Sequence, residues 1–486
     1  MEKPMNKLEN LEPKRVFYYF EQLSQIPRCS YNEENVSNYI REIGKKLGLE
    51  TVQDNVLNVI IRKPATLGYE DSEGVIIQGH MDMVCEKEDT SSHDFNKDPI
   101  KLEIDGDYIH ADKTTLGADN GIAVAMGLAI LEDTTLEHPS IELLVTTSEE
   151  TEMDGALGLS EGVLKGTRLL NIDSEEEGVL VTGSAGGELI EVKIPIEYKE
   201  VSDSYEIEIE VRGLMGGHSG MEIHKPRGNS NKILNSILRE IKETIDIKLI
   251  SITGGTKDNA IPRQSRVKIG VDSEDLSKFN DKIEEIRKKI IDENKLEEPD
   301  ISIGITKGNL VSKVLSSKVL SSLILLIDSI PTGVFTRLPQ NEEIVESSSN
   351  LAIIKTEEEQ IIIQVSTRSS AESVLLKLRQ NILEEIDKTN ASYSISGNYP
   401  EWEYNPESKL RDTALALYKE VFGKEMESTV IHAGLECGVF AKKYPELDII
   451  SFGPNMYDVH TPKERLSISS TKRTYEYLKE LLKRLN

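Results

Sequence analysis

Cysteines and basic residues are scarce in this sequence. Its three cysteines, Cys29, Cys85 and Cys437, stand far apart among 486 residues, with no CxxC pair. Such spacing predicts no disulfide framework and is typical of a protein in a reducing cytoplasm. Only 57 lysines and arginines oppose 85 aspartates and glutamates, which gives a net charge of −28. A chain this acidic repels phosphate backbones, so no nucleic-acid partner is expected.

Long apolar runs are also missing. The N-terminal stretch MEKPMNKLENLEPKRVF has no apolar core of signal-peptide type. The most apolar later run, VLSSLILLIDSI at 319–330, is short and interrupted by serine and aspartate. We therefore expect a soluble, cytoplasmic protein with no membrane partner. The chain length predicts two or three domains.

Residues 1–187 and 400–486 share one pattern. Apolar runs of strand length occur at 55–63, 74–84, 141–150, 169–172 and 447–453. Helical patterns lie among them at 13–26, 32–48, 118–133, 410–423 and 470–485. Fully apolar strands that alternate with helices predict an α/β fold, in which helices cover both faces of a largely parallel sheet.

Residues 188–399 have a different texture. Apolar and polar residues alternate in SYEIEIEVRG, RVKIGVD and QIIIQVST, as in strands with one wet face. The stretch after 397, rich in proline and asparagine, predicts a linker. We therefore predict an α+β domain at 188–399 inserted into a discontinuous domain formed by 1–187 and 400–486. SYEIEIEVRG…NSILREI and EEQIIIQVST…LRQNILEEI share a strand–loop–helix order, which leaves an internal duplication open.

Histidines and carboxylates recur where the apolar strands end. They come from separate parts of the chain: His80, Asp82, Asp119, Glu149, Glu150, Asp173 and His460. In an open α/β sheet the carboxyl ends of the strands line one shared edge, where binding sites form. Imidazole nitrogen and carboxylate oxygen are the ligand set of Zn²⁺, Mn²⁺ or Co²⁺ in hydrolytic sites. A bridging carboxylate would allow two metals about 3.5–4 Å apart.

Each of these motifs alone has a simpler explanation. The Asn-Gly of GADNG is a strong turn signal, and the acids of TSEE could cap a helix in solvent. A single histidine at a strand end is more often an ordinary polar residue than a ligand. Their joint occurrence at successive strand ends favours a metal site. From spacing alone, two interpretations stay open: a metal hydrolase, or a set of ordinary turns, caps and polar residues.

The motif series resembles that of the M20 metallopeptidases. GHMDMV, GADNG, TSEE, NIDSEEEG and DVHTPKE occur in the family's order over essentially the whole chain. GADNGIAVA together with HAGLECG is similar to the aminoacyl-histidine dipeptidase branch of that family. The resemblance implies a lid domain where the sequence predicts the inserted domain.

The resemblance also implies roles for the residues at the strand ends. His80 and Asp173 would hold one metal, and Glu150 and His460 the other, with Asp119 bridging the two. Asp82 would orient the His80 imidazole. Glu149 would act as general base, taking a proton from the metal-bridging water and passing it to the leaving amine.

Further roles are implied for the lid and for HAGLECG. His218 would stabilise the tetrahedral oxyanion, typically by reaching a dimer partner's active site. Asn259 and Arg368 would contact the substrate, and Arg368 suits the C-terminal carboxylate of a dipeptide. Gly434 and Glu436 would belong to a substrate-binding loop. A homodimer through the lid domain is therefore expected, and whether lid residues act in cis or in trans stays open.

Taken together, the sequence predicts a two-metal dipeptidase for Xaa-His and other dipeptides. Zinc is the expected metal, with cobalt and manganese as alternatives. An N-acyl-amino-acid deacylase or a tripeptidase on the same scaffold would use the same ligands, so these alternatives stay open. A non-catalytic metal-binding assembly protein is a further alternative, although Glu149 beside the full ligand set argues against it.

Overall fold

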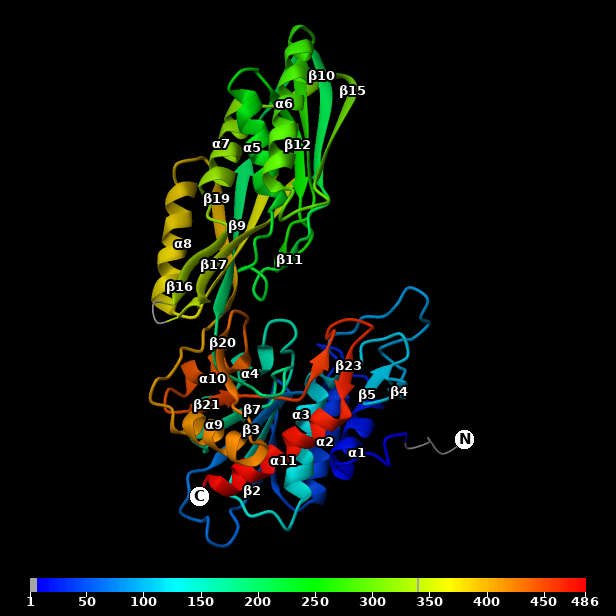
Figure 1. Cartoon of the computed structure of the whole chain (residues 1–486), viewed down its shortest axis with the longest axis vertical. Helices are drawn as coiled ribbons and strands as arrows, with labels where there is room; N and C mark the ends of the chain where they lie inside the picture. Colours follow the sequence, from blue (N-terminus) through cyan, green and yellow to red (C-terminus); the bar gives the residue numbers. More distant parts are fainter. Residues whose placement is uncertain (1–6, 339–340) are drawn as a thin grey trace. The chain divides into compact units, whose positions relative to one another are not determined.

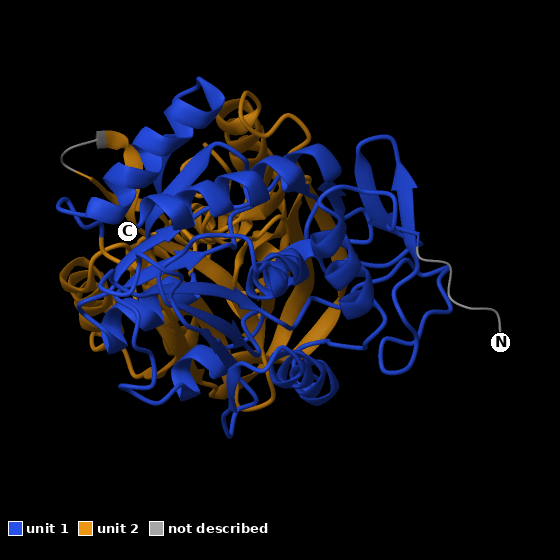
Figure 2. Ribbon diagram, turned by 90° about the horizontal axis from the view of Figure 1, so that it is seen from below, with its two compact units in different colours: residues 1–184, 404–430, 435–486 blue, residues 185–403, 431–434 orange. Residues whose placement is uncertain are grey.

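The computed structural model describes residues 7–338 and 341–486, which form two compact units (Figure 2). Unit 1 consists of the described residues up to 184 together with 404–430 and 435–486. Unit 2 consists of residues 185–403 and 431–434, within the described part. The expected boundaries, 187/188 and 399/400, lie within a few residues of these. The sequence pattern did not predict that residues 431–434 belong to unit 2.

An eight-stranded mixed sheet forms the centre of unit 1 (Figure 1). In spatial order its strands are β1 (Glu50–Gln53), β2 (Val59–Lys63), β6 (Ile141–Thr146), β3 (Val75–His80), β7 (Arg168–Asn171), β21 (Asp448–Ser451), β8 (Val179–Ser184) and β20 (Glu427–Ile431). Strands β6, β3, β7 and β21 are mutually parallel. Strand β1 pairs antiparallel with β2, β2 with β6, and β8 with β21. Residues 54–58, which join β1 to β2, are too few for the crossover that parallel strands need, so this pair is antiparallel.

Helices pack around this sheet. They are α1 (Lys14–Ser24), α2 (Glu34–Lys46), α3 (Ala118–Glu132), α4 (Asp154–Gly158), α9 (Lys409–Phe422), α10 (Glu436–Lys443) and α11 (Ile468–Arg484). Helix α3 is apolar all round and contacts both α1 and β3, so it is a buried helix. A Cβ atom on Gly79 would lie 2.4 Å from Asn120 Oδ1, so a glycine in β3 lets α3 approach closely. None of the helices in the described ranges has the length and apolar character needed to cross a membrane.

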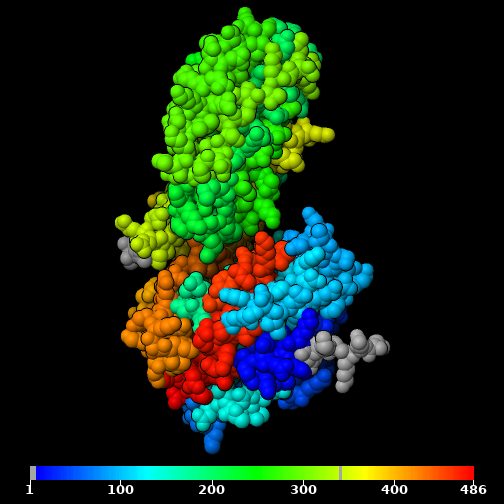
Figure 3. Space-filling view, turned by 45° about the vertical axis from the view of Figure 1, so that its right-hand side comes forward, coloured from blue at the N-terminus to red at the C-terminus, as the bar shows by residue number. Residues whose placement is uncertain are grey.

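A second, four-stranded sheet lies within unit 1. Its order is β22 (Met456–Tyr457), β23 (Arg465–Ser467), β5 (Tyr108–Ala111) and β4 (Leu102–Asp105). Arg465 pairs with His110, so the C-terminal segment joins a sheet begun by the N-terminal segment. Figures 1 and 3 show the blue and red ends of the chain side by side in this unit. Unit 1 is therefore one folding unit built from both ends of the chain.

The prediction about the cysteines was wrong. Cys29 and Cys85 form a disulfide, whereas Cys437 is buried and unpaired. Cys29 and Met83 form an isolated β-bridge, so the segment before α2 lies alongside the segment after β3. The pairing spans 56 positions and follows from packing, so no local CxxC pattern could signal it.

Unit 2 contains a nine-stranded antiparallel sheet and four long helices. The strands of the sheet are β15 (Ser302–Leu315), β10 (Tyr198–Arg212), β14 (Ser265–Asp272), β12 (Lys248–Gly254), β17 (Asn341–Thr356), β18 (Gln360–Ser369), β9 (Gly186–Pro195), β19 (Ser392–Tyr399) and β16 (Gly333–Leu338), the last pairing with β17. The helices are α5 (Ser230–Lys242), α6 (Leu276–Asn294), α7 (Ser317–Ser329) and α8 (Glu372–Ile386), with the short turn η1 (Ser273–Asp275) before α6. Burial alternates strictly along β18, because the helices cover only one face of the sheet.

Two halves of this sheet have the same strand order. One half is built from β10–α5–β12–β14–α6–β15, and the other from β9–α7–β17–β18–α8–β19. In each half the spatial order is fourth, first, third and second strand, and the halves join where β12 pairs with β17. The duplication left open by the sequence is thus present in the topology. Its equivalent segments differ from those expected, since β18–α8 corresponds to β14–α6 rather than to β10–α5.

Candidate metal centre

The parallel strands of unit 1 bring the predicted residues to one edge of the sheet. His80 is the last residue of β3 and pairs with Thr146, the last residue of β6. Gln78 of β3 pairs with Asn171, the last residue of β7. The loops after β6 and β7, which carry Glu149, Glu150 and Asp173, therefore start beside His80.

His80 lies in a pocket of carboxylates. Its Nε2 atom is 3.1 Å from Asp119 Oδ1 and 3.6 Å from Asp173 Oδ1. Its Nδ1 atom is 3.2 Å from Asp82 Oδ1, on the other side of the ring. The His80 side chain is 1% exposed, so these groups rather than water surround it. One ring nitrogen thus faces two candidate ligands, and the other faces the carboxylate expected to orient the ring.

His460 completes a second group around the same aspartate. It lies in the loop between β22 and β23, nine residues past the end of β21, and it has a positive φ of 62°. Its Nε2 atom is 3.1 Å from Asp119 Oδ2 and 2.9 Å from Glu150 Oε2. Asp119 therefore offers one oxygen to each imidazole, as a ligand shared by two metals would do.

Asp82 also organises the loop after β6. The backbone N–H groups of Glu149 and Glu150 donate to its two carboxylate oxygens at 3.1 and 3.2 Å. The Ser30 hydroxyl donates to Asp82 Oδ2 at 2.8 Å. The Glu149 side chain ends 3.9 Å from His80 Nε2, so it lies beside the ligand group. One buried carboxylate thus fixes His80 and both glutamates.

Burial and the neighbouring charges shift the pKa values of several side chains in this cluster. Burial, with Asp119 nearby, raises the pKa of Glu150 to about 7, and burial raises the pKa of Asp173 to about 6. Burial lowers the pKa of His460, but Asp119 and Glu150 outweigh it and raise that pKa to about 11. Burial also raises the pKa of Glu149 well above its usual value. Glu149, Glu150 and Asp173 thus resist ionisation, whereas the His460 imidazole beside Asp119 and Glu150 favours protonation. A divalent cation would favour the ionised carboxylates and the neutral imidazole.

The donor atoms also fit a metal by their types and spacing. Single ligand atoms of His80, Asp119 and Glu150 all lie within 4.8 Å of one another. Nitrogen and oxygen donors in this combination suit Zn²⁺, Co²⁺ or Mn²⁺. The structure therefore contains a candidate metal site at the edge where the sequence predicted one.

Two of the remaining candidates meet in unit 2. Strands β11 (Gly217–His218) and β13 (Ala260–Ile261) form a short ribbon in which His218 pairs with Ala260, the residue after Asn259. Nδ1 of His218 accepts the backbone N–H groups of Gly220 and Met221, which fixes the ring. Asn259 is exposed.

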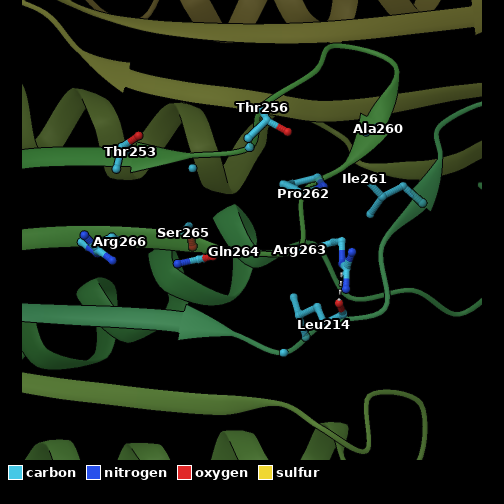
Figure 4. Close-up of a pocket in the computed structure, with 13 residues that line it drawn as sticks. Leu214, Thr253, Thr256, Ala260, Ile261, Pro262, Arg263, Gln264, Ser265 and Arg266 are labelled. Atoms are coloured by element: carbon cyan, nitrogen blue, oxygen red, sulfur yellow. Dashed lines mark hydrogen bonds between the residues drawn. The ribbon is translucent and has the colours of Figure 1, made fainter. Parts of the chain in front are cut away.

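Unit 2 has a pocket of about 620 Å³ whose lining includes Ala260 and Ile261 of this ribbon (Figure 4). Residues 213–214, 253–256 and 260–266 line it. Arg263 Nε donates to the backbone oxygen of Leu214 across the pocket.

Arg368 lies elsewhere in unit 2 with partners that the sequence analysis did not identify. Its Nη1 donates to Tyr399 Oη at 2.7 Å, and Arg368 pairs across the sheet with Ser348. The Ser348 hydroxyl lies 2.7 Å from Nε2 of His432, a residue of the HAGLECG motif. Burial and the charge of Arg368 lower the pKa of His432 to about 3, so the ring is neutral. His432, the histidine of HAGLECG, is the feature of the sequence that could have indicated this cluster.

Gly434 and Glu436, two residues apart in the sequence, belong to different units. Gly434 belongs to unit 2 and is half-buried. Glu436 begins α10 in unit 1, is fully buried, and accepts hydrogen bonds from Gln78 and Thr146. Its side chain is therefore held by strands β3 and β6 and does not contact solvent.

The fold and the site together define a metal-dependent hydrolase of α/β type with a second, antiparallel unit. The sequence matches the peptidase family M20/M25/M40 over residues 76–484, and the chain belongs to this family. It is 36% identical to the cytosol non-specific dipeptidase of Escherichia coli over 485 residues, 99% of each chain.

Solved structures agree with this assignment. The aminoacylhistidine dipeptidase of Vibrio alginolyticus matches with a TM-score of 0.89 and 34% identity over 98% of both chains. A tripeptidase from Staphylococcus aureus, 14% identical with a TM-score of 0.57 over 98% of this chain and 99% of its own, shares the fold. Recognition as an M20 family member is thus confirmed.

Metal binding is testable through stability. Metal-free protein should unfold at a higher temperature once Zn²⁺ or Co²⁺ is added, because a ligand at 100 times its Kd stabilises by about 2.7 kcal/mol. Asp119→Asn should reduce this shift, since both imidazoles lose their shared carboxylate. Calorimetry of metal-free and metal-loaded samples measures the effect. Asp89→Asn, at an exposed position, is the control. An undiminished shift in Asp119→Asn would contradict the site.

Proposed function

We propose that this protein hydrolyses the peptide bond of dipeptides, including Xaa-His dipeptides, with two divalent metal ions. One observation carries the proposal: Asp119 is shared between His80 and His460, and Glu149 lies unshared beside them. Similarity to two dipeptidases over nearly the whole chain supports the substrate class.

The metal-holding residues follow from the two groups of donors. His80 and Asp173 would hold one ion, Glu150 and His460 the other, and Asp119 both. When bound, such ions supply a water of lowered pKa and polarise the scissile carbonyl. We propose zinc as the native metal, with cobalt and manganese as substitutes that the same donors accept.

Glu149 and Asp82 have separate tasks in this proposal. Glu149 takes the proton from the attacking water and delivers it to the nitrogen of the leaving amine. Its carboxylate is near His80 and is not needed as a ligand, which leaves it able to move a proton. Asp82 holds the His80 ring and the backbone of Glu149, so the base and the ligand keep a fixed relation.

Residues of unit 2 would recognise the substrate. Arg368 would bind the C-terminal carboxylate through its guanidinium, and Tyr399 holds that guanidinium in place. His218 would stabilise the oxyanion, and Asn259 would contact the substrate backbone. Gly434 and Glu436 would belong to the substrate-binding loop, as the family resemblance implies.

We also propose, from the family resemblance, a homodimer formed through unit 2. The cytosolic location in the name of the Escherichia coli relative extends to this chain as part of the same proposal. Sedimentation equilibrium gives the mass of the assembly directly, and a monomer at micromolar concentration would contradict the dimer.

Replacing the base should separate catalysis from metal binding. Glu149→Gln should lower kcat by about 10²- to 10⁴-fold, because proton transfer is lost while the ligands remain. Metal content measured by atomic emission should match that of the parent protein. Glu152→Gln, an exposed glutamate in the same loop, is the matched control and should retain activity. Near-normal turnover in Glu149→Gln would disprove the base assignment.

Substrate class is decided by parallel assays and by Arg368. The parent should cleave Xaa-His and other dipeptides faster than acetylated amino acids or tripeptides, and should discriminate against dipeptides amidated at the C-terminus. Arg368→Leu should raise KM for free dipeptides roughly 10- to 100-fold, as expected for losing hydrogen bonds to a charged group. Amidated dipeptides are the internal control, since their KM should change little. Faster cleavage of acetylated amino acids would favour the deacylase alternative instead.

A further inference from the structure

Glu464 accepts hydrogen bonds from four consecutive backbone N–H groups. Its Oε2 atom accepts from Leu116 and Gly117 at 2.7 and 3.0 Å. Its Oε1 atom accepts from Ala118 and Asp119 at 2.8 and 3.4 Å. The carboxylate thus encloses the whole turn that ends at Asp119, the residue shared between the two imidazoles.

This turn cannot satisfy its own N–H groups. Gly117 is left-handed, with φ 70° and ψ 33°, and Asp119 is non-helical, with φ −80° and ψ 105°. The first N–H groups of a helix have no acceptor within the helix, and here the irregular backbone adds to that deficit. Glu464 is 2% exposed, so water does not replace it. Buried N–H groups without an acceptor would cost free energy, which makes this carboxylate specific to the conformation of the turn.

Arg28 holds the opposite side of the same turn. Its guanidinium donates to the backbone oxygens of Gly117, Met81 and Asp82. Arg28 is 2% exposed, and the charge of Glu464 acts on it favourably. Arg28 therefore ties the Asp119 turn to the segment that follows His80, while Glu464 ties it to a different part of the chain.

That other part is the loop of His460. Glu464 and His460 lie in one loop between β22 and β23, four residues apart. The backbone N–H of Glu464 donates to Thr461 O at 3.0 Å, which closes the loop on itself. The next residue, Arg465, is anchored by pairing with His110 of β5. A displacement of Glu464 would therefore move His460 relative to Asp119.

We propose that Glu464 is a positioning residue that sets the spacing between Asp119 and His460, so that one metal ion can be held by both. The inference rests on the metal-dependent function proposed above, but its test uses metal binding without substrate. Arg28 serves as its counterpart, fixing the same turn with respect to His80 and Asp82.

The test is Glu464→Gln, an isosteric change. The amide nitrogen cannot accept a hydrogen bond, so two of the four N–H groups lose their acceptor. Affinity for Co²⁺ should fall about 10- to 100-fold, as for other residues that orient metal ligands. Titration calorimetry measures the affinity, and the visible absorption of the Co²⁺-loaded protein reports the ligand geometry. We expect a changed spectrum and a lowered kcat with little change in KM.

Glu142→Gln is the matched control. Glu142 is also a buried carboxylate of unit 1, and it accepts the backbone N–H groups of Lys165 and Gly166 at 2.6 and 2.7 Å. It lies near the start of β6, whereas the metal centre lies beyond the end of that strand. Glu142→Gln should lower the unfolding temperature yet leave Co²⁺ affinity and spectrum unchanged.

Each outcome decides the proposal. Parent-like affinity and spectrum in Glu464→Gln would overturn it, as would an equal loss of affinity in Glu142→Gln. If Glu464→Gln does not fold, Glu464→Asp retains the charge with a shorter reach, and parent-like Co²⁺ binding in that variant would overturn the proposal. If the parent binds Co²⁺ but cleaves no dipeptide while Glu464→Gln binds weakly, the proposed function fails and the positioning role stands.

Discussion

The site depends on the sharing of the Asp119 carboxylate between two imidazoles. His80 comes from a buried strand and His460 from a loop more than 300 residues later, and each ring directs Nε2 at one oxygen of the same side chain. Such a junction concentrates negative charge in a buried space, which a protein tolerates only with cations or protons present. Other parts of unit 1 position the residues of this junction. Parallel strands bring the candidate ligands to one edge, and buried polar groups hold the irregular turn that carries Asp119.

Two kinds of support surround the junction. Asp82 accepts the backbone N–H groups of Glu149 and Glu150 and faces the His80 ring, so one carboxylate contacts three of the predicted site residues. On the other side, Glu464 and Arg28 hold the turn of Asp119 by its N–H and C=O groups. Unit 2 is organised differently. Its sheet contains the same strand order twice, and helices cover only one face of this sheet. In unit 1 the candidate metal donors lie where strands end, whereas in unit 2 Arg368 lies on a regular strand and donates to Tyr399.

Much of this organisation was predictable from local pattern. Apolar runs identified β3, β6 and β7, and the polar residues after them proved to be neighbours. Alternation of apolar and polar residues predicted the antiparallel strands β10, β14 and β18. The predicted α/β fold is confirmed, and β6, β3, β7 and β21 are parallel as expected. Strands β1 and β2 pair antiparallel because the connection between them is too short for a crossover. The disulfide of Cys29 and Cys85, the cluster of Ser348 with His432, and the equivalence of β18–α8 with β14–α6 were not predicted.

The sequence by itself determined the kinds of donor atoms and the strand ends that carry them, because hydrophobic periodicity is a short-range property that each segment expresses alone. Only the tertiary structure decided which oxygen faces which ring, which cysteines pair, and that Glu464 encloses a turn 345 positions earlier. These contacts arise when separate segments pack together, and their geometry depends on the exact approach of α3 to β3 and of the His460 loop to both. Local pattern holds no record of that approach, so the sequence predicted candidate donor residues but not the contacts of Glu464 and Arg28 with the Asp119 turn.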